Sequence, residues 1–258
     1  MKKITLTFLV CLVFIISSVT VYAAEKTAEK PIRVFFIGNS LTYSYDVPRQ
    51  FAEFAKQAGH NVEYDFYAPG GSSFQDHAKN PLITQLLKGQ NWDYVVLQEH
   101  SQRPGWAPHQ VKQEVILSAD ILVQTIKAAN KNSQVVYYET MARKYGDPRN
   151  VHNVPELATY EGMQARVNGT YHFLAKRHDA ILAPVGEVWA QMRKKYPQIE
   201  LYSDDVHQNK MGAYLSGCTI FAAIFQENCN GGLADIMVTK GQGRIVREVV
   251  QDVVSNNK

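Results

Sequence analysis

The alternation of strand-like and helix-like segments is the feature that most constrains this chain. Five short runs rich in β-branched and aromatic residues predict strands at 33–37, 62–67, 92–97, 134–138 and 180–184. Segments with helical spacing of apolar residues predict helices at 46–58, 73–87, 109–129, 156–178, 185–196, 210–225 and 244–253. Strands separated by helices favour right-handed crossovers and a mostly parallel sheet. We therefore expect a three-layer α/β/α sandwich with a five-stranded sheet of flavodoxin-like order 2-1-3-4-5, forming one domain over residues 24–258.

That strand order also predicts where a ligand binds. Strand 1 lies between strands 2 and 3, and its carboxyl end is the switch point at which ligands bind in such sheets. The residues that follow these three strands are Ser40, Gly70–Gly71 and Gln98. We expect them to surround one crevice.

Ser40 is the candidate nucleophile. It follows the buried first strand and precedes the predicted helix 46–58, where backbone N–H groups and the helix dipole stabilise an oxyanion. Two other interpretations of the Gly38–Thr42 stretch remain open. It is also typical of a simple helix cap and of a phosphate-holding turn in a nucleotide or flavin protein, but the latter should carry a second binding motif, which we do not find in the sequence.

A serine that attacks a carbonyl needs a base, and His207 is the best candidate. Asp204 lies three residues before it and is placed to accept the Nδ1–H of the imidazole, which leaves Nε2 free to face the serine. His100, at the end of the third strand, remains a competitor. Six histidines are set aside because they lie at the wrong strand end, in helices, or in loops without a nearby carboxylate: His60, His77, His109, His152, His172 and His178.

Acyl transfer also needs donors for the oxygen that becomes negative. The Ser40 N–H is the first, and Gly71 suits a second because the backbone of a residue without Cβ approaches a ligand closely. We expect the side-chain amide of Gln98 to be the third. A turn role for the glycines and a merely strand-ending role for Gln98 are the alternatives.

With these positions in place, the chain resembles the SGNH (GDSL-like) hydrolase superfamily. The resemblance rests on Gly38–Thr42, Gly70–Gly71 and Ser203–His207, and it covers nearly the whole chain after its first residues. The chain has Asn39 where the commoner pattern has aspartate, and Gln98 where the third block has asparagine, as in a bacterial branch. The resemblance implies a serine esterase without metal or cofactor, acting on small acyl groups, often acetyl groups on carbohydrate, or on lipids.

Several loop residues favour a sugar ester over a lipid. The loops after strands 3 and 4 combine stacking and hydrogen-bonding side chains, and no long apolar segment suggests an acyl-chain tunnel. We expect substrate contacts from Asn39, His100, Trp106 and Tyr145. A lipid esterase and a non-catalytic protein that binds a glycan or an anion on the same scaffold are the alternatives.

The first 23 residues are typical of a secretory signal peptide. Lys2 and Lys3 precede an apolar run from residue 4 to 21, and Val21–Ala23 forms a small-residue cleavage pattern. We expect a periplasmic or secreted product without stable membrane insertion; an uncleaved N-terminal anchor is the alternative.

The net charge argues against a nucleic-acid partner, and the two cysteines after residue 23 allow either a disulfide or free thiols. The formal net charge is +3, of which Lys2 and Lys3 supply two, so the chain has no electrostatic footprint for nucleic acid. Cys218 and Cys229 form either a disulfide, if the chain turns back after about Gln226, or a pair of buried thiols.

Overall fold

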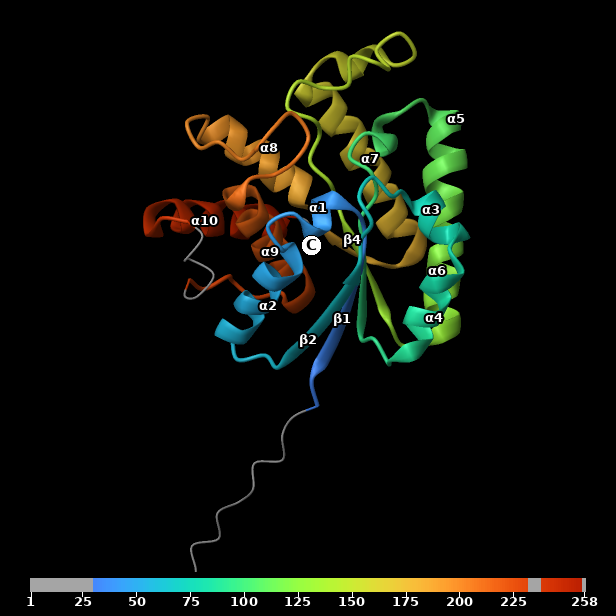
Figure 1. Ribbon diagram of the computed structural model, residues 1–258. Coiled ribbons are helices and arrows are strands. Elements are labelled where there is room, and N and C mark those ends of the chain that lie inside the picture. The colour runs from blue at the N-terminus through green and yellow to red at the C-terminus, as the bar shows by residue number, and fades with distance from the viewer. Residues whose placement is uncertain (1–29, 232–237, 257–258) are drawn as a thin grey trace, which may run out of the picture.

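The computed structural model describes residues 30–231 and 238–256 (Figure 1). The expected signal peptide, residues 1–23, lies outside the described residues. The centre of the fold is a parallel sheet of order β2-β1-β3-β4-β5, as predicted. Its strands are β1 (Ile32–Ile37), β2 (Val62–Tyr67), β3 (Tyr94–Leu97), β4 (Gln134–Tyr138) and β5 (Ile181–Ala183).

Helices cover both faces of the sheet and form the predicted three layers (Figure 1). One layer contains α2 (Val47–Gln57), α8 (Val185–Lys195), α9 (Lys210–Phe225) and α10 (Lys240–Asn256). The other contains α3 (Phe74–Lys79), α4 (Pro81–Gly89), α6 (Leu117–Ala129) and α7 (Tyr160–His178). The shorter pieces are α1 (Ser40–Tyr43), α5 (Pro108–Gln110), a π-helical stretch (Val111–Ile116) and 3₁₀ turns at Arg103–Gly105 and Pro155–Ala158.

The apolar run of β1 is buried on both faces because successive side chains of a strand point to opposite sides. Phe36 packs edge-on against Phe51 of α2, whereas Phe35 stacks on Trp92 with ring centroids 4.9 Å apart. The strand is thereby fixed between two aromatic cores, and its carboxyl end is held in a defined position.

Two predicted helices differ from those observed: one divides in two, and the other begins later. Residues 73–87 form α3 and α4, because Asn80 caps the second helix by accepting a hydrogen bond from Leu82 N, and Pro81 occupies its first turn. The helix predicted from 156 begins at Tyr160 instead, since the Thr159 side chain accepts from Gly162 N and starts the α-helix there.

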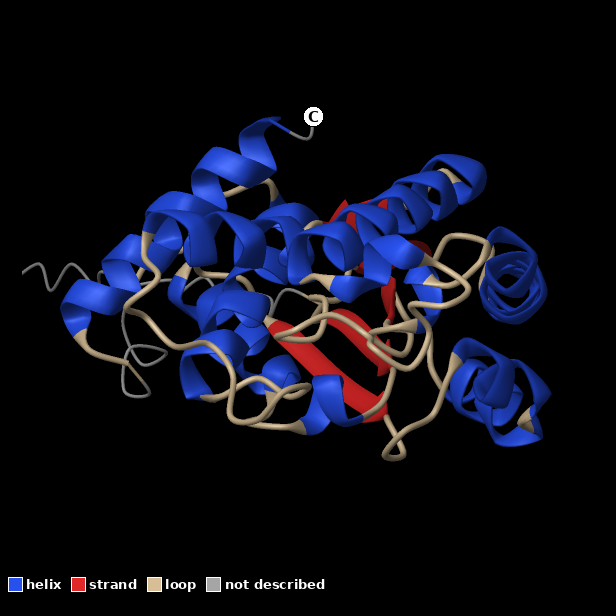
Figure 2. Cartoon of the chain, turned by 90° about the horizontal axis from the view of Figure 1, so that it is seen from above, coloured by secondary structure: helices blue, strands red, loops and turns tan. Residues whose placement is uncertain are grey.

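The carboxyl ends of the strands gather at one edge of the sheet. Figure 2 looks down on this edge and shows loops lying over the strands between the helices. The loop between α8 and α9 crosses to the same edge, so that residues near position 207 meet those near position 40.

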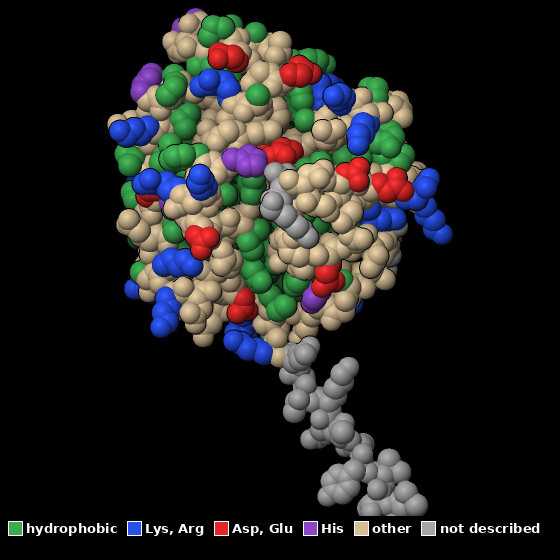
Figure 3. All heavy atoms as spheres, turned by 180° about the vertical axis from the view of Figure 1, so that it is seen from behind, with side chains coloured by type: hydrophobic (Ala, Val, Ile, Leu, Met, Phe, Trp, Pro, Cys, Tyr) green, Lys and Arg blue, Asp and Glu red, His purple; other side chains and the backbone are tan. Residues whose placement is uncertain are grey.

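A disulfide ties the segment that follows α9 back to the middle of that helix. Cys218 and Cys229 are joined with Cα atoms 5.8 Å apart, and the chain turns back at Gln226, which has the left-handed φ of 55°. No described helix is both long enough and apolar enough to span a membrane. On the face seen in Figure 3, acidic and basic side chains are interspersed.

Candidate active site

Ser40 is the first residue of α1 and does not lie in a turn before α2. The N-cap of this short helix is Asn39, whose Oδ1 accepts a hydrogen bond from Leu41 N at 3.0 Å. Because Asn39 performs the capping, the Ser40 hydroxyl is left free for another partner.

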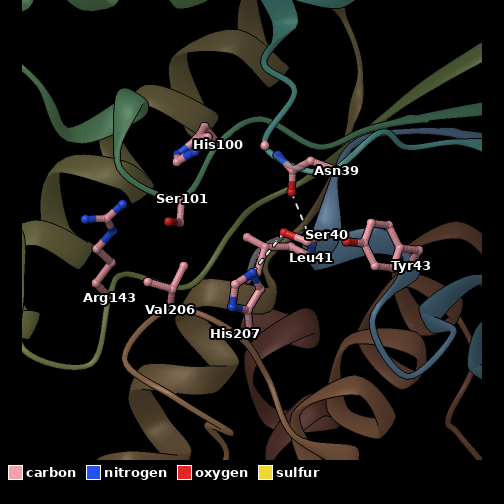
Figure 4. Close-up of a pocket in the computed structure, with 11 residues that line it drawn as sticks. Asn39, Ser40, Leu41, Tyr43, His100, Ser101, Arg143, Val206 and His207 are labelled. Carbon is pink, nitrogen blue, oxygen red and sulfur yellow. Dashed lines mark hydrogen bonds between the residues drawn. The ribbon is translucent and has the colours of Figure 1, made fainter.

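That partner is His207, which lies 167 positions away in the sequence. Ser40 Oγ is 3.0 Å from His207 Nε2, and His207 Nδ1 is 2.9 Å from Asp204 Oδ2 (Figure 4 shows the serine and the imidazole). The carboxylate accepts the Nδ1–H, so Nε2 carries the lone pair that faces the serine hydroxyl. The three side chains thus have the hydrogen-bonded arrangement that a nucleophile, a base and an orienting group would need.

The loop that carries Asp204 holds its carboxylate ionised. Asp204 Oδ1 accepts hydrogen bonds from Val206 N at 2.7 Å and His207 N at 2.6 Å, while Oδ2 receives the imidazole. Partial burial raises the pKa of Asp204, but these hydrogen bonds outweigh it and bring the pKa to about 2. Asp204 therefore orients His207 as an anion at neutral pH.

The structure contradicts the expectation that the Gln98 amide points into the crevice. Gln98 is 0% exposed, and its Nε2 donates to Asn39 Oδ1 and to the carbonyl of Glu99. Its Oε1 accepts from Asn39 N at 2.9 Å and from Thr42 Oγ1 at 2.8 Å. Gln98 thus clamps the segment around Ser40 to the end of β3.

The other two residues expected to supply donors line the cavity. Ser40 and Gly71 line a cavity of about 420 Å³, and their N–H groups have no hydrogen-bond acceptor among residues 30–231 and 238–256. Gly71 has φ of 72°, a conformation that glycine adopts without strain. Asn39 Nδ2 donates to Ser72 O at 2.8 Å and so ties this glycine turn to the serine segment.

The residues that line the cavity come from four strand ends and from the loop before α9. They are Asn39, Ser40, Leu41, Tyr43, Gly70, Gly71, His100, Ser101, Arg143, Val206 and His207 (Figure 4). Among the described residues, no group of three His, Cys, Asp or Glu side chains could hold a metal ion.

His100 lines the cavity but makes no contact with the serine of the kind that His207 makes. Burial and the neighbouring Arg143 and Arg103 lower the pKa of His100 to about 4, so its imidazole is neutral at neutral pH. Four of the six histidines set aside from the sequence have other partners: His60 with Glu227, His77 with Gly38 O, His172 with Glu187, and His178 with Asp120.

Trp106 and Tyr145 do not line the cavity, contrary to their expected role in substrate contact. Trp106 packs inward because its Nε1 donates to the buried Asp147 at 3.4 Å and the guanidinium of Arg103 lies over its ring. Tyr145 is 64% exposed beside Lys144. Arg143, from the same polar loop as Tyr145, reaches the cavity instead; the sequence marks this loop as rich in arginine but does not mark which arginine turns inward.

Comparison with solved structures identifies the fold. A candidate SGNH hydrolase from Slackia heliotrinireducens has a TM-score of 0.62 and 24% identity, over 76% of this chain and 100% of that one. The chain has the fold of the SGNH hydrolases. A DUF4886 family protein from Bacteroides uniformis shares this SGNH-hydrolase fold with a TM-score of 0.71 and 17% identity, over 88% of this chain and 96% of that one. So does an acetyl xylan esterase, with a TM-score of 0.50 and 20% identity, over 75% of this chain and 100% of that one. No protein-family model matches the sequence, and neither does any curated protein.

Proposed function

We propose that this chain is an exported serine esterase that removes small acyl groups, above all acetyl groups, from carbohydrate. The observation that carries the proposal is the 3.0 Å contact between Ser40 Oγ and His207 Nε2, continued to Asp204, at the wall of an open cavity. A serine that served only to cap or pack a helix would not need an oriented imidazole.

The geometry suits a two-step acyl transfer. Ser40 Oγ attacks the ester carbonyl while its proton passes to His207 Nε2, and the free N–H groups of Ser40 and Gly71 bind the oxygen that becomes negative. The C–O bond to the alcohol then breaks, and Nε2 returns the proton to the departing oxygen. Water repeats these steps in reverse on the acyl-serine and releases the acid.

Gln98 acts in this scheme as a positioning residue. Its amide holds Asn39 and Thr42 on either side of Ser40, so two backbone donors remain to bind the oxyanion. The change from asparagine to glutamine at this strand end is consistent with that scaffold role, since the longer side chain reaches Asn39 and not the cavity.

Three features support a small acyl group on a sugar in place of a lipid. The apolar residues that line the cavity are Leu41, Tyr43 and Val206, and they provide an apolar surface large enough for a short acyl group. The other lining residues are polar or glycine. An acetyl xylan esterase shares the fold and is a precedent for this chemistry. The signal-like residues 1–23 support export to a compartment in which glycans are found.

The test uses hydrolysis of p-nitrophenyl acetate and labelling by a fluorophosphonate probe, which reacts only with an activated serine. We expect Ser40→Ala to abolish labelling, and we expect Ser40→Ala and His207→Ala each to lower kcat by about 10³-fold or more. Ser44→Ala and His109→Ala are the matched controls, because both residues lie outside the cavity lining. An unlabelled, inactive wild-type protein would instead indicate a binder on this scaffold.

A further inference from the structure

The cavity holds a second group of polar side chains that the proposed mechanism does not use. These are His100 and Ser101, which follow β3, and Arg143, which follows β4. Figure 4 shows them grouped on the side of the cavity opposite Ser40 and His207. A ligand that reaches the serine therefore also meets these three residues.

Each member of the group has a buried polar atom without a hydrogen-bond partner: His100 Nδ1, Ser101 Oγ and Arg143 Nε. Ser101 is only 2% exposed, and the Arg143 side chain is 17% exposed. Among the described residues, none accepts a hydrogen bond from Arg143 Nε. Buried donors are almost always paired in folded proteins, so three unpaired polar atoms in one cavity wall indicate a site that is completed by a ligand.

The acidic neighbour of the guanidinium leaves its Nε without a partner. Asp147 Oδ1 forms an ion pair with Arg143 Nη1 at 3.5 Å, but the two groups are not aligned for a hydrogen bond. The other oxygen of Asp147 accepts from Asn150 Nδ2 at 2.7 Å. Arg103 lies near the group as well, but its charge is paired with Glu114 at 3.0 Å.

Backbone hydrogen bonds hold Arg143 in place on both sides. Ala142 N donates to Gln164 Oε1 at 2.5 Å, and Ala142 O accepts from Tyr202 Oη at 2.6 Å. On the other side, Lys144 N donates to Asp205 O at 2.9 Å, which links this loop to the one that carries His207. The backbone on both sides of Arg143 is therefore preorganised, and a ligand need not supply the free energy to order the loop.

We propose that His100, Ser101 and Arg143 form a carboxylate-binding subsite, so that the substrate is an acylated sugar acid. The proposal rests on the proposed function and specifies the alcohol part of its ester. A guanidinium presents several N–H groups in a planar fork that matches a carboxylate, and a serine hydroxyl adds a further donor. The neutral imidazole of His100 completes this wall of the cavity and adds no negative charge that would repel a carboxylate.

The first experiment measures binding and does not depend on turnover. Galacturonate and its neutral counterpart galactose are titrated by calorimetry into the Ser40→Ala protein. We expect galacturonate to bind at least about 10-fold more tightly, as a hydrogen bond between charged groups implies. Equal affinity for the two sugars would overturn the subsite.

The second experiment compares the rates of hydrolysis of O-acetyl galacturonate and O-acetyl galactose. We expect the acidic ester to have the higher kcat/KM, and Arg143→Gln and Ser101→Ala each to lower the ratio of the two kcat/KM values. Arg143→Lys keeps the charge but loses the fork, and it should give an intermediate ratio. Arg149→Gln removes an exposed arginine of the same loop, outside the cavity lining, and should change the ratio less than Arg143→Gln does.

The outcomes separate the subsite from the proposed function. Galacturonate binding that is lost in Arg143→Gln, without any ester hydrolysis, would retain the subsite and reject the esterase. Hydrolysis of both esters at equal rates, with equal sugar binding, would retain the esterase and reject the subsite. If Arg143→Gln does not fold, Ser101→Ala decides, because it removes one small hydroxyl and should still weaken galacturonate binding.

Discussion

Replacing Gln98 with leucine tests whether this residue positions the nucleophile. The leucine fills a similar volume but removes the oxygen that accepts hydrogen bonds from Asn39 N and Thr42 Oγ1. A buried donor left without an acceptor costs about 1 to 3 kcal/mol, so the two together should lower the free energy of unfolding by about 2 to 6 kcal/mol. This is a large part of the roughly 5 to 15 kcal/mol that stabilises a typical domain.

The same substitution should reduce activity, because Asn39 and Thr42 flank Ser40. A shift of about 1 Å in a reacting group can cost about 10²-fold in rate, and we expect kcat for p-nitrophenyl acetate to fall by about that factor. Unfolding in denaturant, followed by circular dichroism, gives the change in stability, and initial rates give the change in kcat.

A double-mutant cycle with Thr42→Val gives the sharper result. In the wild-type protein, Thr42→Val removes one hydrogen bond and should cost about 0.5 to 1.5 kcal/mol. In Gln98→Leu it removes a hydroxyl that already lacks its acceptor, and its cost should vanish or reverse sign. The coupling should therefore be about 0.5 to 1.5 kcal/mol if the cost vanishes, and larger if it reverses sign. Additive effects on stability, with a loss of kcat confined to Gln98→Leu, would refute the clamp and return Gln98 to the role of an oxyanion donor.

Three further predictions follow from other parts of the structure. A Cβ at Gly38 would lie 2.2 Å from Thr42 Oγ1 and 2.5 Å from Gln98 Oε1, so Gly38→Ala should lower the free energy of unfolding by about 1 to 3 kcal/mol and lower kcat. The control is Gly169→Ala in α7, whose Cβ meets no atom within 4 Å and should be neutral or stabilising. Equal melting temperatures of the two variants would contradict this prediction. Burial raises the pKa of Glu99 to about 8 and also raises that of Glu139, so the folded chain retains protons that the unfolded chain releases, and thermal stability should fall as pH rises from about 4.5 through about 8. The decline should be shallower in Glu139→Gln, and a melting temperature that stays level over this window would count against it. Cys218 and Cys229 are separated by 11 positions in the sequence, and reduction of their bond should cost about 3 kcal/mol, seen as a lower melting temperature in dithiothreitol that Cys218→Ala reproduces without the reductant.

The parts of the site that were predictable from the sequence depend on local patterns or on strand order. The apolar run before Ser40 identified β1, and the three-residue spacing of Asp204 and His207 placed a carboxylate beside the imidazole. The order of the strands then accounts for the meeting of Ser40 and Gly71 at one edge.

The parts that were not predictable depend on competition between partners. The Gln98 amide was free to turn toward the cavity or toward Asn39, and only the packed structure shows that Asn39 and Thr42 occupy both of its ends. Trp106 turned inward because Asp147, 41 residues later, offers an acceptor for its indole N–H. Arg143 reaches the cavity through contacts of its neighbours with residues far along the chain, which no local pattern encodes.

The hydrogen bond from Lys144 N to Asp205 O limits how the substrate preference of the proposed esterase could change, because it links two loops of the cavity. It joins the loop that carries Arg143, which we propose selects the substrate, to the loop that carries His207, the proposed proton acceptor. Insertions or swaps near position 144 should therefore disturb proton transfer along with selectivity. An engineer seeking a new specificity would do better to vary side chains at positions 100, 101 and 143 and to leave that backbone junction as it is.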